Sequence, residues 1–157
     1  MNILIDKHKQ ILVALMEAKV DFLLIGGYAV IYHGYGRSTG DMDVWLKPDN
    51  ENKLRFLAVL EKHLTDKSGI EKVKTLDFTS VVAFYIGAPP DKVDFITKIA
   101  GAKFDEAFSH KALLPIQNYQ IPVLHFNDLI ANKLLSARLQ DKADAEELQK
   151  IEKLKKK

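Results

Sequence analysis

Two aspartates lie one residue apart inside a short apolar segment, GDMDVWL, at residues 40–46. The alternating pattern of this segment predicts a β-strand, in which side chains two residues apart project from the same face. Asp41 and Asp43 are therefore expected side by side. Two unpaired carboxylates repel each other and are costly to bury, so either both face water or a cation neutralises them.

A pair of glycines, Gly26 and Gly27, precedes this segment and directly follows the apolar run FLLI at 22–25. The run predicts a buried strand, and residues 28–36 predict a short helix that later glycines end. The pair then lies where a helix exposes free backbone N–H groups, and the missing side chains let a phosphate group approach. Two interpretations stay open, a tight turn without function and a phosphate-binding turn.

A third aspartate, Asp94, interrupts the segment KVDFITK at 92–98. This segment and the β-branched, aromatic run FTSVVAFYIG at 78–87 predict two strands, and the Pro-rich turn between them predicts a hairpin. A charged residue between Val93 and Phe95 is either a strand-edge residue or part of one site with the first two aspartates.

The remaining segments predict mostly helices. Apolar spacing predicts amphipathic helices over 3–18 and over 51–65, the second capped by Asn50 and carrying one stripe of leucines, namely Leu54, Leu57, Leu60 and Leu64. A short helix is expected at 103–109, followed by a strand, a turn and an edge strand over 112–126, since Pro115 and Pro122 argue against a central position. The last two helices are expected from Asp128 to Leu139, capped by Asn127, and from about Lys142 onward.

This order of elements predicts the α+β class, with a small mixed β-sheet flanked by helices. The 157 residues fit a single domain, 1–157, with a C-terminal helical segment from about 127. No apolar run approaches the roughly 18 residues of a membrane-spanning helix, so no membrane partner is expected. The absence of cysteine excludes disulfides and thiolate metal sites and indicates a reducing cytoplasm.

Charge adds two expectations. Three aspartates without cysteine favour oxygen-binding cations, Mg²⁺ or Mn²⁺, over zinc. The formal net charge of +2 is too small to indicate nucleic acid, although the last eight residues, KIEKLKKK, carry five lysines. This tail is either a solvated terminus or an arm that attracts phosphate.

The combination of an apolar strand, Gly26-Gly27, thirteen further residues and Asp41-Met42-Asp43 resembles the nucleotidyltransferase superfamily related to DNA polymerase β. That family carries a third carboxylate on a later strand between apolar residues, a position that Asp94 matches. The stretch is similar in particular to bacterial minimal nucleotidyltransferases and to the type-E abortive-infection toxin group. The segment FNDLIANKLLSARLQDKADAEEL at 126–148 looks like the closing helices of that group, with matching positions at Lys133, Arg138, Asp141 and Asp144.

The resemblance implies a polymerase β palm-like fold and an enzyme that moves a nucleoside monophosphate from an NTP to an acceptor hydroxyl, releasing pyrophosphate. It implies that Asp41 and Asp43 hold two metal ions, Mg²⁺ or Mn²⁺, and that Asp94 ligates the ion that activates the acceptor. Asp94 is also the candidate general base. The implied nucleotide-binding residues are Gly26, Gly27, Arg37, Ser38, Thr39 and Lys133.

Several of these residues have a structural alternative. Arg37 either pairs with a phosphate or packs over Tyr35 at the surface, and Lys133 either snorkels from an apolar helix face or points at the triphosphate. His33 is interpreted as a structural residue at a helix end or a nucleotide contact. Asp141 and Asp144 either favour a helix dipole or belong to the site. The three tyrosines near the glycines are expected in the core or at its rim: Tyr28, Tyr32 and Tyr35.

The resemblance leaves the acceptor open among RNA, a protein side chain and a small molecule. It also implies a toxin-type role and a partner or antitoxin protein. The rival hypothesis is a non-catalytic, nucleotide-binding regulatory module of the same fold. Three mutually repelling carboxylates argue against this rival, because a retired site has no physical reason to keep them together.

Overall fold

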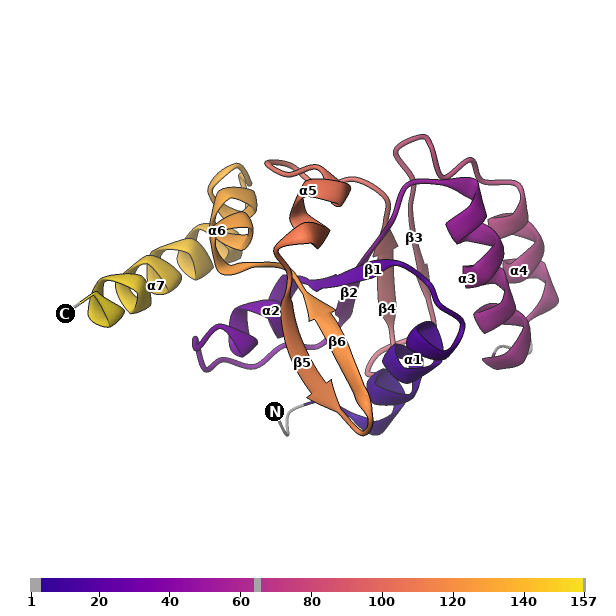
Figure 1. The fold of residues 1–157 in the computed structure, drawn as a ribbon, viewed down its shortest axis with the longest axis horizontal. Helices are drawn as coiled ribbons and strands as arrows, with labels where there is room; N and C mark the ends of the chain where they lie inside the picture. Colours follow the sequence, from indigo (N-terminus) through magenta and orange to yellow (C-terminus); the bar gives the residue numbers. More distant parts are fainter. Residues whose placement is uncertain (1–3, 64–65, 157) are drawn as a thin grey trace.

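The structure, a computed structural model, describes residues 4–63 and 66–156 (Figure 1). Its centre is a six-stranded sheet with the order β3-β4-β2-β1-β6-β5. The strands are β1 (Phe22–Ile25), β2 (Met42–Leu46), β3 (Ala83–Ile86), β4 (Val93–Ile96), β5 (Ala112–Ile116) and β6 (Tyr119–Val123). The sheet is mixed, because β2 runs parallel to β4 and antiparallel to β1, while β1 runs parallel to β6.

Helices surround this sheet. They are α1 (Asp6–Glu17), α2 (Gly26–Tyr32), α3 (Asn50–His63), α4 (Lys67–Lys74), α5 (Phe104–Ser109), α6 (Phe126–Leu134) and α7 (Leu139–Lys155). In Figure 1, α3 and α4 lie side by side at one end of the molecule, and α7 carries the chain away from the sheet at the other end. The predicted α+β class, a small mixed sheet flanked by helices, is confirmed.

The sheet and the helices share one hydrophobic core. Every residue of β1 is buried, as are the apolar side chains of β2 that alternate with Asp43, and the ring of Trp45 donates its indole N–H to the Thr97 carbonyl at 3.0 Å. The helix α1 adds Leu12 and Leu15, both fully buried. Among the described helices, none combines the length and the apolar character needed to cross a membrane.

The chain passes from β1 into α2 without a loop. Gly26 makes this possible, since its φ of +68° belongs to the left-handed region that favours glycine. The helix ends in a Schellman motif, in which Gly34 (φ +117°) donates its N–H to Ile31 and Tyr35 donates to Val30. Glycine therefore ends this helix as predicted, although the helix covers 26–32 rather than 28–36.

The predicted hairpin of β3 and β4 is confirmed, but its first strand is shorter than expected. Strand β3 begins only at Ala83, because residues 77–80 form a turn in which the Asp77 carboxylate accepts from the N–H and hydroxyl of Thr79. The helix α4 was not predicted. Asp66 caps it by accepting from the N–H groups of Ser68 and Gly69.

The predicted leucine stripe of α3 is wrong in part. Leu57 and Leu60 are buried, but Leu54 is 66% exposed, and Leu64 lies outside the described residues. The buried face includes Phe56 and Val59 instead, since Phe56 packs against a cluster of aromatic rings. Asn50 is not the cap either. Asp49 accepts from the Asn52 N–H at 2.7 Å, whereas the Asn50 side chain donates to the Asp77 carboxylate at 3.1 Å, in the turn before β3.

Four predictions in the last third of the chain need correction. Strand β6 is internal, with β1 on one side and β5 on the other, although its pairing with β1 is limited to Leu24 opposite Val123, beyond Pro122. The penultimate helix ends at Leu134 rather than Leu139. The last helix, α7, begins at Leu139, three residues earlier than predicted, and the Ser136 hydroxyl accepts from the N–H of Arg138 just before it. His125 rather than Asn127 caps α6.

The orientation of α3 gives a first prediction. Phe56→Ala should lower the free energy of unfolding by about 3–5 kcal/mol, because it opens a cavity among aromatic rings. Leu54→Ala, on the exposed side of the same helix, should change it by less than about 0.5 kcal/mol. Urea denaturation of both variants checks the orientation, and equal losses would contradict it.

Candidate active site

Asp43 and Asp94 lie side by side on neighbouring strands. The parallel register of β2 and β4 pairs Met42 with Val93 and Asp43 with Asp94. Because alternate residues share a face, Asp41 and Lys92 belong to the same face as this pair. The side chains of Asp41 and Asp94 are 39% and 36% exposed. All three expected carboxylates therefore lie at the end of β2 and β4 where their pairing begins, with Asp41 as the residue just before β2.

Burial and the neighbouring Asp94 carboxylate raise the pKa of Asp43 from 3.8 to about 6. Lys133 and Arg138 act in the opposite direction, and Asp41 adds to the repulsion. A carboxylate held in this way binds a proton or another cation more readily than an exposed aspartate does. The charged form of Asp43 is therefore disfavoured, first by burial and then by repulsion from Asp94.

Gly26 lies directly against Asp43. A Cβ built on Gly26 would overlap the Asp43 carboxylate, so both the positive φ and the close approach require glycine here. The first turn of α2 and the carboxylate pair are thus in contact, which is the neighbourhood that a metal-bound triphosphate needs.

Gly27 has a different environment from the one that we expected. The sequence predicted open space for a phosphate at its missing side chain, but a Cβ there would overlap the Thr39 hydroxyl and approach an Arg37 nitrogen at 3.3 Å. Gly27→Val is therefore expected to displace Thr39, so its effect on activity would not distinguish a role in phosphate binding from a role in packing. Ser38 is exposed, and its carbonyl accepts from Arg37 at 2.8 Å.

A cavity of about 540 Å³ opens at the carboxylate pair. It is bounded by the β1–α2 junction, by β3 and β4, by residues 98–100 and by the segment that joins α6 to α7. Its charged lining residues are Asp43, Asp94, Lys98, Lys133, Arg138 and Asp141. The volume lies within the range of small-molecule and cofactor pockets, and acidic and basic groups face one space.

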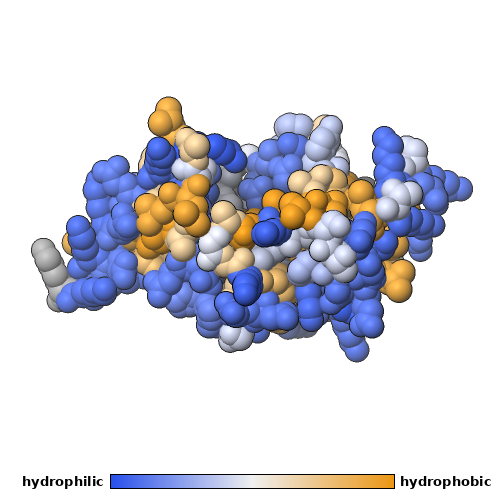
Figure 2. All heavy atoms as spheres, turned by 90° about the horizontal axis from the view of Figure 1, so that it is seen from above, coloured by the Kyte–Doolittle hydropathy of each residue, from blue (hydrophilic) through white to orange (hydrophobic). Residues whose placement is uncertain are grey.

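Apolar side chains surround this charged centre. Phe84, Tyr85 and Leu135 line the cavity, and Leu134 and Leu139, at the α6–α7 junction, are 54% and 84% exposed. Figure 2 shows apolar side chains in separate groups among charged ones on the face seen from above. A ligand with both charged and apolar parts suits this arrangement.

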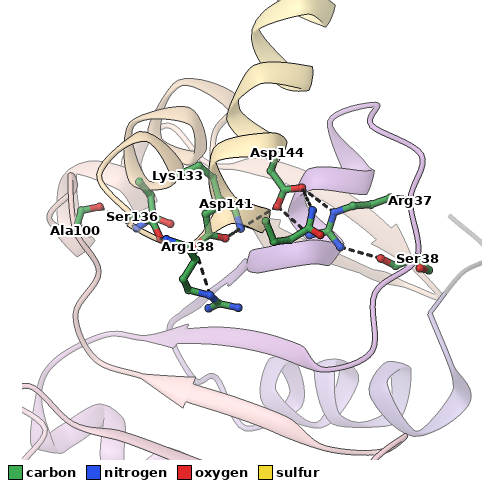
Figure 3. A network of polar contacts seen from close by, with 10 residues as sticks. Arg37, Ser38, Ala100, Lys133, Ser136, Arg138, Asp141 and Asp144 are labelled. Carbon is green, nitrogen blue, oxygen red and sulfur yellow. Dashed lines mark hydrogen bonds and ion pairs between the residues drawn. The ribbon is translucent and has the colours of Figure 1, made fainter.

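A network of ion pairs joins α6 and α7 to the segment after α2 (Figure 3). Arg37 donates from two nitrogens to the Asp144 carboxylate, at 2.8 and 2.9 Å, and Asp144 is fully buried. The buried Lys133 lies 2.7 Å from Asp141 and 3.2 Å from Asp144. Burial opposes the charged forms of both aspartates, but hydrogen bonds from the basic residues and from Ser136 and Gln140 more than compensate and lower their pKa values.

This network decides between the alternative interpretations of Arg37, Lys133, Asp141 and Asp144. Arg37 does not simply pack over Tyr35, because its guanidinium is paired with Asp144. Lys133 does not snorkel, since it is buried in two ion pairs while it lines the cavity. Asp141 and Asp144 do more than favour a helix dipole, because they neutralise both basic residues.

His33 and the tyrosines have structural contacts. The His33 ring nitrogen Nε2 donates to the Leu124 carbonyl at 2.7 Å, and burial lowers the pKa of this ring. Tyr28 is buried with its hydroxyl 2.9 Å from His8, Tyr32 donates to the Leu113 carbonyl, and Tyr35 packs against the core. The predicted core or rim position of the tyrosines is confirmed.

The fit to a divalent metal rests on the donors themselves. Within 4–63 and 66–156, no group of three or more histidine, aspartate or glutamate side chains is already arranged as a metal site. Asp43 and Asp94 nevertheless offer oxygen donors side by side, with Asp41 on the same face, and burial together with the neighbouring Asp94 raises the pKa of Asp43. Oxygen donors of this kind suit Mg²⁺ or Mn²⁺, so the residues fit the expected ion.

Sequence reasoning missed the basic residue of this face. The Lys92 ammonium lies 3.4 Å from both Asp41 and Asp94 and 4.9 Å from the ring centroid of Tyr85. Its position two residues before Asp94 in a predicted strand was the available signal, since it places both side chains on one face.

Comparison with solved structures identifies the fold. The lincosamide antibiotic adenylyltransferase LnuA, solved with lincomycin bound, is similar with a TM-score of 0.54 and 15% identity over 95% of this chain and 98% of that chain. A Thermotoga maritima protein, TM1012, provisionally described as a nucleotidyltransferase, is similar with a TM-score of 0.53 and 14% identity, covering 94% and 88%. No family model and no curated protein matches the sequence. The chain therefore shares the fold of these two proteins, a nucleotidyltransferase-like fold, as the sequence resemblance predicted.

The raised pKa of Asp43 gives a prediction on stability. The folded protein binds this proton more tightly than the unfolded chain, so ionisation of Asp43 lowers the free energy of unfolding as pH rises from about 4 to about 6. Without metal, Asp43→Asn should match the wild type near pH 4 and exceed it by on the order of 2 kcal/mol above pH 6. Urea denaturation in EDTA measures this difference. The exposed Asp91→Asn is the control, and a gain at every pH would contradict the assignment.

The buried network gives a second prediction. Asp144→Ala removes the partner of Arg37 and one partner of Lys133, so the free energy of unfolding should fall by about 3–5 kcal/mol. Glu146→Ala changes a 71%-exposed side chain on the same helix and should cost less than about 0.5 kcal/mol. Thermal and urea unfolding of both variants measure these changes. A loss for Asp144→Ala as small as that for Glu146→Ala would contradict a stabilising role of the network.

Proposed function

We propose that this protein is a metal-dependent nucleotidyltransferase that moves a nucleoside monophosphate from an NTP to an acceptor hydroxyl. One observation carries the proposal: Asp43 and Asp94 are paired on neighbouring strands at a cavity that also receives Lys98, Lys133 and Arg138. Carboxylates that hold a cation and basic groups that hold phosphate are the two needs of an NTP with its metal.

The reaction joins the acceptor oxygen to the α-phosphorus. The bond from the α-phosphorus to the bridging oxygen of the β-phosphate breaks, and pyrophosphate leaves with that electron pair. The acceptor proton passes to the Asp94 carboxylate, whose 36% exposure leaves it accessible from the cavity. Asp41, Asp43 and Asp94 would hold Mg²⁺ or Mn²⁺, which when bound neutralises the triphosphate and the developing charge.

The remaining residues bind or position the nucleotide in this proposal. The backbone N–H groups at Gly26 and Gly27 face the β- and γ-phosphates, assisted by the hydroxyls of Ser38 and Thr39. Lys133 faces the triphosphate from the cavity wall. Arg37 acts mainly by holding α7 in place through Asp144.

The acceptor remains a choice among RNA, a protein side chain and a small molecule. LnuA is an adenylyltransferase for a lincosamide antibiotic, and its similarity extends over 98% of that chain. Apolar and charged residues share the cavity of this protein, which also suits a small hydroxyl compound. We therefore propose a small-molecule hydroxyl as the first acceptor to test, and a toxin role follows only if RNA or protein is labelled.

The experiment is incubation with α-labelled NTPs and Mg²⁺ against total RNA, total protein and a panel of small hydroxyl compounds. Asp94→Asn should reduce label transfer and pyrophosphate release at least about 100-fold, because it removes the proton acceptor. Unchanged transfer by this variant would contradict the role of Asp94.

Nucleotide binding is measured separately, as the rise in melting temperature on adding NTP and Mn²⁺. At about 100 times the Kd the folded state gains about 2.7 kcal/mol. Asp43→Asn should lose most of this shift, and Glu146→Ala should keep it. Binding without pyrophosphate release against every acceptor would favour the rival, a non-catalytic nucleotide-binding module.

A further inference from the structure

The ammonium group of Lys92 lies among the carboxylates of the candidate site. Its Nζ is 3.4 Å from Oδ2 of Asp41 and 3.4 Å from Oδ1 of Asp94, and it lies over the Tyr85 ring at 4.9 Å from the centroid. The side chain is 25% exposed. Two carboxylates and an aromatic face therefore hold this cation where β2 and β4 are paired.

The backbone of Lys92 is fixed by buried groups. Its carbonyl accepts from the Met42 N–H and from the His8 ring, each at 3.2 Å. Because a carbonyl can only accept, His8 carries its proton on Nε2, and its Nδ1 accepts from the Tyr28 hydroxyl at 2.9 Å. Burial lowers the pKa of His8, which keeps the ring neutral. The fold thus holds the start of β4 so that the Lys92 side chain joins the Asp94 face.

The positive charge of Lys92 affects how the neighbouring carboxylates can bind a metal ion. Asp41, Asp43 and Asp94 carry up to three negative charges, and Lys92 compensates one of them at the same oxygens that a metal ion would use. A divalent ion that binds Asp41 and Asp94 must displace this ammonium or accept its repulsion. A triphosphate offers the displaced ammonium another anionic partner.

We propose that Lys92 is a built-in counter-ion that competes with Mg²⁺ or Mn²⁺ for Asp41 and Asp94, so that full metal loading follows nucleotide binding. The inference rests on the proposed function, because it assumes that these carboxylates hold the metal. In this inference Lys92 sets the order of binding. The triphosphate binds first and attracts the Lys92 ammonium away from Asp41 and Asp94, and the metal ions then bind these carboxylates.

The test measures Mn²⁺ binding by the nucleotide-free protein, from the loss of the free-ion signal in electron paramagnetic resonance. Lys92→Met should bind Mn²⁺ about tenfold more tightly than the wild type, because one positive charge near the ion is removed. Lys92→Gln should behave likewise, and Lys92→Arg, which keeps the charge, should stay near the wild type. Lys150→Met is the matched control, since Lys150 is a 60%-exposed lysine on α7 that does not line the cavity.

Melting temperature gives a second readout. In EDTA, Lys92→Met should melt below the wild type, because its carboxylates repel without compensation, and Mn²⁺ should raise its melting temperature more than that of Lys150→Met. Circular dichroism confirms that each variant is folded.

The outcomes separate this inference from the proposed function. Equal Mn²⁺ affinity in the wild type, Lys92→Met and Lys92→Gln, with binding lost in Asp43→Asn, would overturn the inference and leave the proposed function standing. No Mn²⁺ binding by any variant, with or without ATP, would overturn both. Tighter binding confined to the Lys92→Met and Lys92→Gln variants would support the inference.

Discussion

The parallel pairing of β2 with β4 is the constraint on which the candidate site depends. This register places Asp43 beside Asp94, and the residues that alternate with them, Met42, Val44 and Phe95, are buried in the core. A slip of one residue would turn the carboxylates inward and the apolar side chains outward. Hydrophobic burial on one side of the sheet therefore fixes two mutually repelling charges on the other.

Two charge clusters flank the cavity, and they differ in balance. Arg37 and Lys133 face Asp141 and Asp144, so two positive charges meet two negative ones in a buried network with ideal hydrogen-bond lengths. The second cluster sets three carboxylates against Lys92. Burial first, and the Asp94 carboxylate second, raise the pKa of Asp43 to about 6, although Lys133 and Arg138 act in the opposite direction. Mutual charge compensation explains the first cluster, whereas the second keeps an excess of negative charge, which supports the proposed cation-dependent role.

Sequence reasoning located the local features of this site and missed its long-range ones. The strand at 22–25, the glycine turn and the strand at 42–46 follow from periodicity and turn chemistry, and the three aspartates follow from their strand faces. The ion pair of Arg37 with Asp144 joins residues 107 positions apart, and no local pattern encodes it. The helix α4 and the buried face of α3 were missed because tertiary packing, rather than leucine spacing, decides which side is covered.

The same ion pair joins the two longer stretches on which, together with Asp94, the sequence resemblance rests. Residues 22–46 provide the glycine turn, Arg37 and two carboxylates, and residues 126–148 provide Lys133, Asp141 and Asp144. Since Asp144 holds Arg37 and neighbours Lys133, the second stretch builds a wall of the cavity that begins at the first. An incoming phosphate would have to compete with Asp141 and Asp144 for Lys133. Arg138 lies 3.8 Å from Asp141 but its side chain is 80% exposed, and Lys98 is exposed as well, so these two residues are more accessible to an anion than the buried Lys133.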